Sequence, residues 1–180
     1  RALLALLTIA IGHAAMVSIM VMTPIHMAHV DVQLRVIGLV ISIHVAGMYA
    51  FSPVIGYLTD RIGRLATIGL GISLLLTSAI ISGTSAAEQS VQLAIGLFLL
   101  GLGWSATLIA GSTLLTESVP ANLKAGTQGV ADLVMNLSGA LGGAVAGVII
   151  AVLSYGWLCV MASIPVIALA FYLLKVKRIS

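Results

Sequence analysis

The chain has 180 residues, of which 61% are apolar, and it carries only eight Lys and Arg residues and five Asp and Glu residues. A soluble domain with so few charges would lack a polar surface, and a disordered or nucleic-acid-binding chain would need far more Lys, Arg and other polar residues. These classes are excluded, and because the basic residues are dispersed, the net charge of +3 does not indicate an anionic partner.

Five uncharged stretches separate the charged residues along the chain. They cover residues 2–30, 36–59, 65–87, 89–116 and 133–174. A helix needs roughly 20 apolar residues to cross the hydrocarbon core of a bilayer, so the first four stretches each fit one helix and the fifth fits two. We therefore predict an all-α membrane protein with six transmembrane helices, at about residues 2–22, 36–58, 65–85, 91–116, 126–153 and 156–174. In this prediction, Thr23 and Pro24 end the first helix.

The Lys and Arg residues gather on one side of the predicted membrane. The opposite side carries only Arg35, whereas seven basic residues lie in the loops and termini of the first side: Arg1, Arg61, Arg64, Lys124, Lys175, Lys177 and Arg178. Loops that stay in the cytoplasm are enriched in Lys and Arg. We therefore expect a bundle in the plasma membrane, the inner membrane of the cell, with both termini in the cytoplasm.

The fifth predicted helix carries glycines at four-residue spacing. Gly139, Gly143 and Gly147 follow this spacing, with Gly142 and Ala146 alongside. Small residues at such positions let two helix backbones approach closely in lipid. The pattern predicts tight packing of this helix against a neighbour, although glycine is also common in membrane helices for no special reason.

The turn between the second and third helices carries a recognisable motif. It contains Gly56, Asp60, Arg61, Gly63 and Arg64 in the sequence GYLTDRIGRL. The two glycines allow close approach and a tight turn, Asp60 can cap a helix, and the arginines offer forked donors to carboxylates. The motif closely resembles the G-x-L-x-D-R-x-G-R signature of the major facilitator superfamily (MFS) of transporters, in which it sets the conformation of the carrier.

A second element supports this resemblance. Glu117 to Lys124, read as ESVPANLK, is similar to the E-x-x-P-x-x-x-R element of the family, with Lys in place of Arg. The resemblance implies a cytoplasmic charge network that includes Glu117, Lys124 and Asp132 and that stabilises one conformation. We predict that Glu117 pairs with Arg64 or Arg61. Lysine lacks the bidentate fork of arginine, so the pairing of Lys124 is less well defined, and interfacial charges that extend to water are the alternative.

The resemblance implies that residues 1–180 form one half of a twelve-helix transporter. The first half of such transporters usually carries an Arg in its fourth helix, and in antiporters a G-P-x-x-G-G motif in its fifth. Here residues 91–116 are uncharged, and residues 138–143, read as SGALGG, lack the proline. We therefore expect the C-terminal half, with the N-terminal half absent from this sequence and acting as its partner.

In transporters of this type the first and fourth helices line a central cavity, with the second and fifth beside them. Polar side chains occur in the middle of these four helices, where they are expensive unless they face protein or water. The candidate cavity residues are His13, His44, Trp104, Ser105 and Asn136. Histidine titrates near neutral pH, so His13 or His44 could bind a proton, but the coupling carboxylate could equally lie in the other half.

Several classes of function fit these residues. An apolar cavity without fixed charge favours secondary active, proton-coupled efflux of hydrophobic or drug-like small molecules, with sugar or metabolite uptake as the alternative. Transport of a soft metal ion is a further alternative, because one side of the first helix carries His13, Met16 and Met20. However, methionines also serve as adaptable packing. An intramembrane serine protease is disfavoured because no later helix offers a histidine base. We predict no cofactor and no resident metal, and a packed thiol at Cys159.

Overall fold

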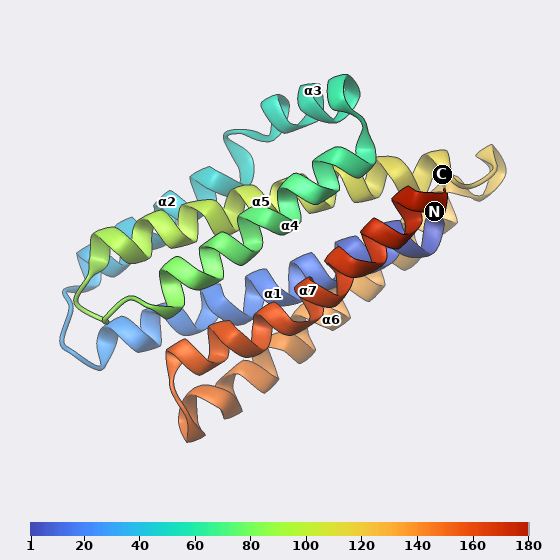
Figure 1. The fold of residues 1–180 in the computed structure, drawn as a ribbon. Coiled ribbons are helices and arrows are strands. Elements are labelled where there is room, and N and C mark those ends of the chain that lie inside the picture. The colour runs from blue at the N-terminus through green and yellow to red at the C-terminus, as the bar shows by residue number, and fades with distance from the viewer. Residues whose placement is uncertain (180) are drawn as a thin grey trace.

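The computed structural model describes residues 1–179 and shows a bundle of long helices (Figure 1). No strand is present in this range. The elements are α1 (Ala2–Ala28), α2 (Leu34–Tyr49), α3 (Ser52–Ile62), α4 (Arg64–Gly83), α5 (Ser90–Glu117), the short 3-10 helix η1 (Ala121–Leu123), α6 (Lys124–Val152) and α7 (Tyr155–Ile179). Six segments of the described chain are long and apolar enough to cross a membrane, with α2 and α3 together forming one of them. The predicted all-α, six-span architecture is confirmed.

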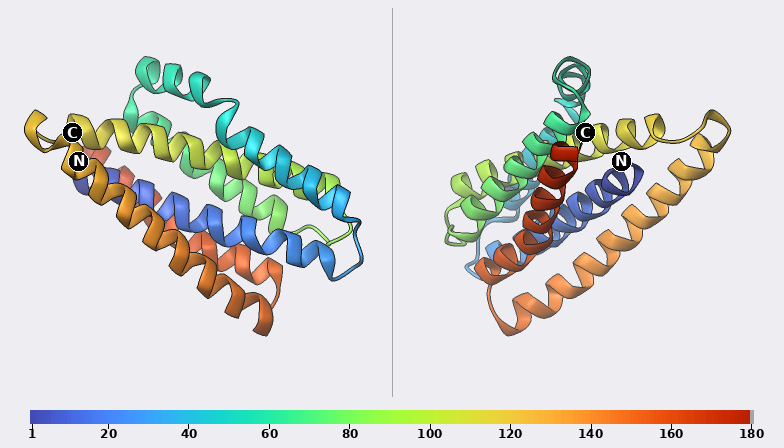
Figure 2. Two further views of the ribbon diagram at one scale, coloured as in Figure 1. Left: turned by 180° about the vertical axis from the view of Figure 1, so that it is seen from behind. Right: turned by 45° about the vertical axis from the view of Figure 1, so that its right-hand side comes forward.

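The helices form two groups that meet along α1 and α5. One group contains α2, α4 and α5, and the other contains α1, α6 and α7, as the views from the front (Figure 1) and from behind (Figure 2) show. The helix α5 packs against α1, α2 and α4, whereas α6 packs mainly against α1. Consequently α1 and α5 are the most buried helices and α6 is the least buried. Both chain ends lie at the same end of the bundle (Figure 1).

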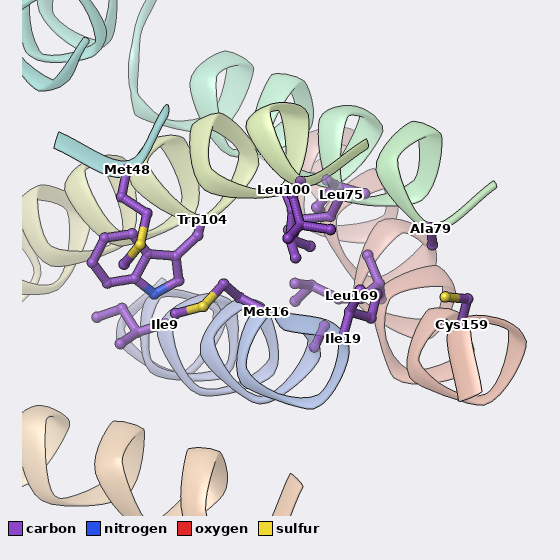
Figure 3. Packing of buried hydrophobic residues seen from close by; sticks show 14 of the residues in the cluster. Ile9, Met16, Ile19, Met48, Leu75, Ala79, Leu100, Trp104, Cys159 and Leu169 are labelled. Carbon is purple, nitrogen blue, oxygen red and sulfur yellow. The ribbon is translucent and has the colours of Figure 1, made fainter. Parts of the chain in front are cut away.

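Large apolar side chains fill the space between the two groups (Figure 3). Ile9, Met16 and Ile19 of α1 face Leu100 and Trp104 of α5 in this core. The α4–α7 side of the same cluster contains Leu75, Ala79, Leu169 and the buried free thiol of Cys159. Since lipid is as apolar as these side chains, close packing rather than removal from water holds the helices together.

Glycines let α5 lie in direct backbone contact with its neighbours. A Cβ placed on Gly101 would meet the carbonyl oxygen of His44 at 2.5 Å and the backbone nitrogen of Met48 at 2.8 Å. One placed on Gly103 would meet the backbone nitrogen of Leu75 at 2.9 Å. The two glycines therefore allow α2 and α4 to pack closely against opposite sides of α5.

The first helix continues past the point at which we predicted its end. Pro24 lies inside α1, which extends to Ala28 rather than ending near residue 22. Proline removes one backbone donor, but side-chain hydroxyls compensate for such losses in membrane helices. The hydroxyl of Thr23 donates to the carbonyl of Ile19 (2.8 Å) and lies 2.7 Å from the hydroxyl of Tyr155. This contact ties the proline turn of α1 to α7.

The second predicted helix, at residues 36–58, is interrupted in the structure. Ala50 and Phe51 separate α2 from α3, and Pro53 is the second residue of α3, where its missing donor costs nothing. The hydroxyl of Ser52 donates to the carbonyl of Met48 (3.0 Å) across the break. The other helices begin and end within two residues of the predicted bounds, except that α7 continues to Ile179 instead of ending near residue 174.

Candidate functional site

The turn between α3 and α4 positions one arginine over the end of α5. Gly63, the only residue of this turn, has φ +91°, a conformation that side chains with a Cβ rarely adopt, and Arg64 is the first residue of α4. The Arg64 Nη2 donates to Oε1 of Glu117 at 2.7 Å, and Nε lies 3.1 Å from both carboxylate oxygens. This forked geometry is the strong form of an ion pair.

Asp60 completes what we call the Arg64 cluster, which consists of Asp60, Arg64 and Glu117. Its Oδ1 lies 3.2 Å from Arg64 Nη2, while Arg64 Nη1 donates to the carbonyl of Thr59 at 3.2 Å. The cluster therefore joins the end of α3, the start of α4 and the end of α5. Arg61 is not part of it, because its Nη1 donates to the hydroxyl of Tyr57 (3.2 Å) on the exposed side of α3.

The structure places Lys124 and Asp132 away from the Arg64 cluster. Both residues are exposed, and the ion pairs found among residues 1–179 involve only Arg64. Asp132 instead accepts a hydrogen bond from Nε2 of Gln128 (3.2 Å), whose Oε1 accepts one from Ser112 of α5 (3.0 Å). Asp132 thus contributes to a link between α5 and α6.

Two candidate cavity residues contact each other in the middle of the bundle. Trp104 Nε1 donates to Nδ1 of His13 at 2.9 Å, so α5 and α1 are joined by one polar contact among apolar side chains. His13 is partly exposed, and the edge of its ring lies against Gly139 of α6, where an added Cβ would come within 2.7 Å of Nε2. Tyr49, the last residue of α2, packs edge-on against Trp104 with ring centroids 5.8 Å apart.

The remaining cavity candidates have different surroundings. His44 is fully buried between α2 and α5, where its Nδ1 donates to the carbonyl of Leu97 at 2.7 Å, so a solute cannot reach it in this conformation. Ser105 is also buried and lies 3.3 Å from the hydroxyl of Ser52. Asn136 is exposed on α6, where Nδ2 donates to the carbonyl of Asp132. Only His13 and Asn136 of the five candidates therefore expose an appreciable part of their surface.

Comparison with known proteins agrees with this arrangement. Residues 4–179 match the family model of the Major Facilitator Superfamily. The chain belongs to this superfamily. Two relatives are the uncharacterized MFS-type transporters YdeG and YddS of Bacillus subtilis (strain 168). YdeG is 46% identical over 141 residues, which are 78% of this chain and 33% of the relative. YddS is 38% identical over 149 residues, which are 83% of this chain and 34% of the relative. The chain thus spans about a third of the length of these curated relatives.

Sequence reasoning missed two contacts at the site of this MFS chain. Tyr49 was passed over because it lies in an apolar stretch, although the nearby Pro53 is a signal for a helix break beside it. The hydrogen bonds that join Ser112 of α5 through Gln128 to Asp132 of α6 were also missed. The spacing of residues within one helix does not indicate which side chain of another helix they contact. The predicted close approach of the α6 glycines is present at Gly139 and Gly142, which face α1.

Proposed function

We propose that this chain is the C-terminal half of a twelve-helix carrier that exports hydrophobic or drug-like small molecules by alternating access, driven by a proton gradient. Its partners are the lipid bilayer, the solute and the N-terminal half of the same transporter. Both termini lie in the cytoplasm, and the membrane is the plasma membrane. Two halves that rock about a site near the bilayer midplane are the general design of such carriers.

The composition of the α1–α5 contact region supports the proposed substrate class. The pair of His13 and Trp104 supplies a polar contact there, large apolar side chains of the core surround it, and the hydroxyl of the nearby Thr107 donates to a carbonyl of its own helix. No charged residue occurs in residues 2–30 or 91–116, which include most of both helices. Sites lined by apolar and aromatic side chains with few polar groups suit hydrophobic solutes, whereas phosphates or dicarboxylates require fixed positive charge. This absence of fixed charge is the observation that carries the proposal.

The exposed face of α6 supports a second half as the partner. This helix is the least buried of the six spans, and apolar side chains project from it along its length. They include Leu133, Leu137, Leu141, Val145 and Val148. Asn136 and Asp132 interrupt this apolar face, and a charged or amide side chain is costly in contact with lipid. Burial against a second six-helix half would remove both groups from lipid.

The Arg64 cluster is proposed to stabilise one of the two conformations of the carrier. It connects three helix ends at the face where both termini lie, so it must stretch or break if α3 moves away from α5. A contact present in one state and absent in the other shifts the population between them. The cluster therefore acts on the rate of transport without contacting the solute.

Transport by the full-length protein in proteoliposomes tests this function. We expect a lipophilic fluorescent dye to move against its gradient when a pH gradient is imposed, and an uncoupler to abolish this movement. His13→Ala should reduce the rate or change its pH dependence. Ser73→Ala should not, because Ser73 is exposed on α4 and its hydroxyl donates to the carbonyl of Leu70.

The same assay separates the alternatives. Uptake of a radiolabelled sugar in place of the dye would favour a metabolite carrier, for which the exposed amide of Asn136 offers a hydrogen-bonding group. Failure of both solutes to respond to the gradient would refute the proposed coupling. Peptide hydrolysis would indicate a protease, although Ser112 donates to Gln128 and Ser73 to a carbonyl, rather than to a histidine.

A further inference from the structure

We propose that His13 is a proton-binding site whose charge state is transmitted through Trp104 and Tyr49 to the break between α2 and α3. This inference deepens the function proposed above and rests on it, because it names the group that would respond to the proton gradient. It is carried by two contacts in sequence: the hydrogen bond from Trp104 to His13, and the edge-on packing of Tyr49 against the indole.

The hydrogen bond to Trp104 fixes which form of His13 is present. An indole nitrogen can only donate, so Nδ1 of His13 must accept and cannot carry a proton. The imidazole is therefore neutral, with its single proton on Nε2. When a second proton binds at Nδ1, two N–H groups would face each other at 2.9 Å, and the bond cannot persist. Protonation of His13 thus forces the indole, the imidazole or both to move.

Among residues 1–179, no carboxylate forms a hydrogen bond or an ion pair with His13 that would compensate the added charge. Trp104 of α5 donates to His13, Gly139 of α6 lies against its ring, and Tyr49 of α2 packs against the indole. The charged and titratable groups of α1 and of the helices packed against it lie farther along these helices: His26 on α1, Arg35 and His44 on α2, Arg64 on α4, Glu117 on α5, Lys124 and Asp132 on α6, and Tyr155, Cys159, Tyr172, Lys175, Lys177 and Arg178 on α7. Asp132, the nearest carboxylate to Gly139 along α6, is about 10 Å away at 1.5 Å per residue.

Gly139 limits the directions in which the charged ring can move. The ring edge with Nε2 lies against the Gly139 backbone, so the imidazole cannot shift toward α6 without pushing that helix away. The indole is the other movable partner, and it is packed between His13 and Tyr49. A displaced indole therefore changes the contact that holds the last residue of α2.

The break between α2 and α3 converts this contact into a larger movement. Tyr49 ends α2, Ala50 and Phe51 lie outside both helices, and Ser52 begins α3 beside Ser105 at 3.3 Å. Figures 1 and 2 show α3 standing away from the bundle beyond this break. Because α3 carries Asp60, a change of its angle reaches the Arg64 cluster.

Tryptophan emission tests the proton-binding step without any transport measurement. The chain has two tryptophans, and in full-length protein with Trp157 and any tryptophan outside this chain replaced by Phe, Trp104 alone reports. An imidazolium in contact quenches indole emission, so the intensity should fall as pH is lowered from 8 to 5, the range in which histidine titrates. His13→Asn should abolish the fall, because the amide oxygen takes the position of Nδ1 and still accepts from the indole but does not titrate.

His29→Asn is the matched control, since His29 is exposed just after the end of α1, far from Trp104. It should leave the titration unchanged. An unchanged emission maximum in His13→Asn would show that Trp104 keeps its surroundings. Emission that does not change with pH in the protein with His13, or that still falls in His13→Asn, would overturn the proposal. Neither outcome depends on whether a dye is exported.

A distance measurement tests the transmission step. Spin labels at Tyr57→Cys on α3 and Leu174→Cys on α7, both exposed positions, should show a pH-dependent shift of distance in the full-length protein. Tyr49→Ala should abolish this shift while the emission of Trp104 still titrates. A distance that stays fixed while His13 titrates, or a shift that survives Tyr49→Ala, would refute transmission through Tyr49.

Discussion

Gly101→Ala provides a sharp test of the packing around α5. Its new Cβ would lie 2.5 Å from the carbonyl oxygen of His44, whereas ordinary contacts begin at 3.4 Å, so α2 and α5 would have to separate by about 0.9 Å. The other close atoms, Met48 N and Gly47 C, also belong to the backbone and cannot rotate away. A gap of roughly this size forfeits a quarter to a half of the dispersion energy of the lining atoms.

We work out the magnitude against a matched control, Gly69→Ala on α4. Its Cβ would meet only the Leu173 side chain, at 3.6 Å, so it gains helix propensity, about 1 kcal/mol, without a clash. Gly101→Ala gains the same propensity but incurs overpacking of about 1–3 kcal/mol. We expect its free energy of unfolding to be lower than that of Gly69→Ala by about 1–3 kcal/mol.

Reversible unfolding of the purified full-length variants in mixed micelles measures this difference. The concentration of denaturing detergent at the midpoint should fall for Gly101→Ala and stay level or rise for Gly69→Ala. The hydrogen bond from His44 to the Leu97 carbonyl lies one turn from Gly101, so it should lengthen with the separation. Equal stability of the two variants would refute the close approach of α2 and α5.

Three further predictions concern the full-length protein. Arg64→Ala should slow transport while expression is retained, whereas Arg61→Ala should have the smaller effect because the Arg61 guanidinium bonds to Tyr57 of its own helix. Equal rates in all forms would leave the Arg64 cluster without a role. A membrane-impermeant thiol reagent should label Glu88→Cys in intact cells and Lys124→Cys only after permeabilisation, and the reverse would overturn the topology. Residues 1–180 alone in liposomes should not take up dye, and robust gradient-driven uptake would contradict the half-transporter proposal.

The six spans could be predicted because charge, apart from Asp132 within α6, interrupts the sequence only near helix ends. Lipid imposes this pattern directly, since a charged residue in the middle of a span is costly. The same reasoning could not predict the break at Ala50 and Phe51, because no charged residue lies there and Pro53 lies inside an uncharged stretch. It also ended α1 at Pro24, although membrane helices tolerate proline when neighbouring groups compensate for the lost donor.

The contacts of the candidate site were harder to predict than the spans. Both α1 and α5 are apolar all around, so no polar face indicates which side of either helix meets which neighbour. His13 and His44 therefore look equivalent in the sequence, yet one is partly exposed beside Trp104 and the other is buried against Leu97. The pairing of Arg64 with Glu117 was easier, because two motifs at helix ends on one side of the membrane restrict the choice of partners.

The break between α2 and α3 also bears on how this segment enters the membrane. The two pieces have 16 and 11 residues, which correspond to helices of about 24 and 16 Å. Neither length reaches across a hydrocarbon core of about 30 Å, and unpaired backbone groups at the break cannot face lipid. Residues 34–62 are therefore expected to leave the translocon as one unit and to remain marginally inserted until α5 is synthesised and packs against both pieces. Biogenesis of this span should consequently depend on a helix that the ribosome makes some forty residues later.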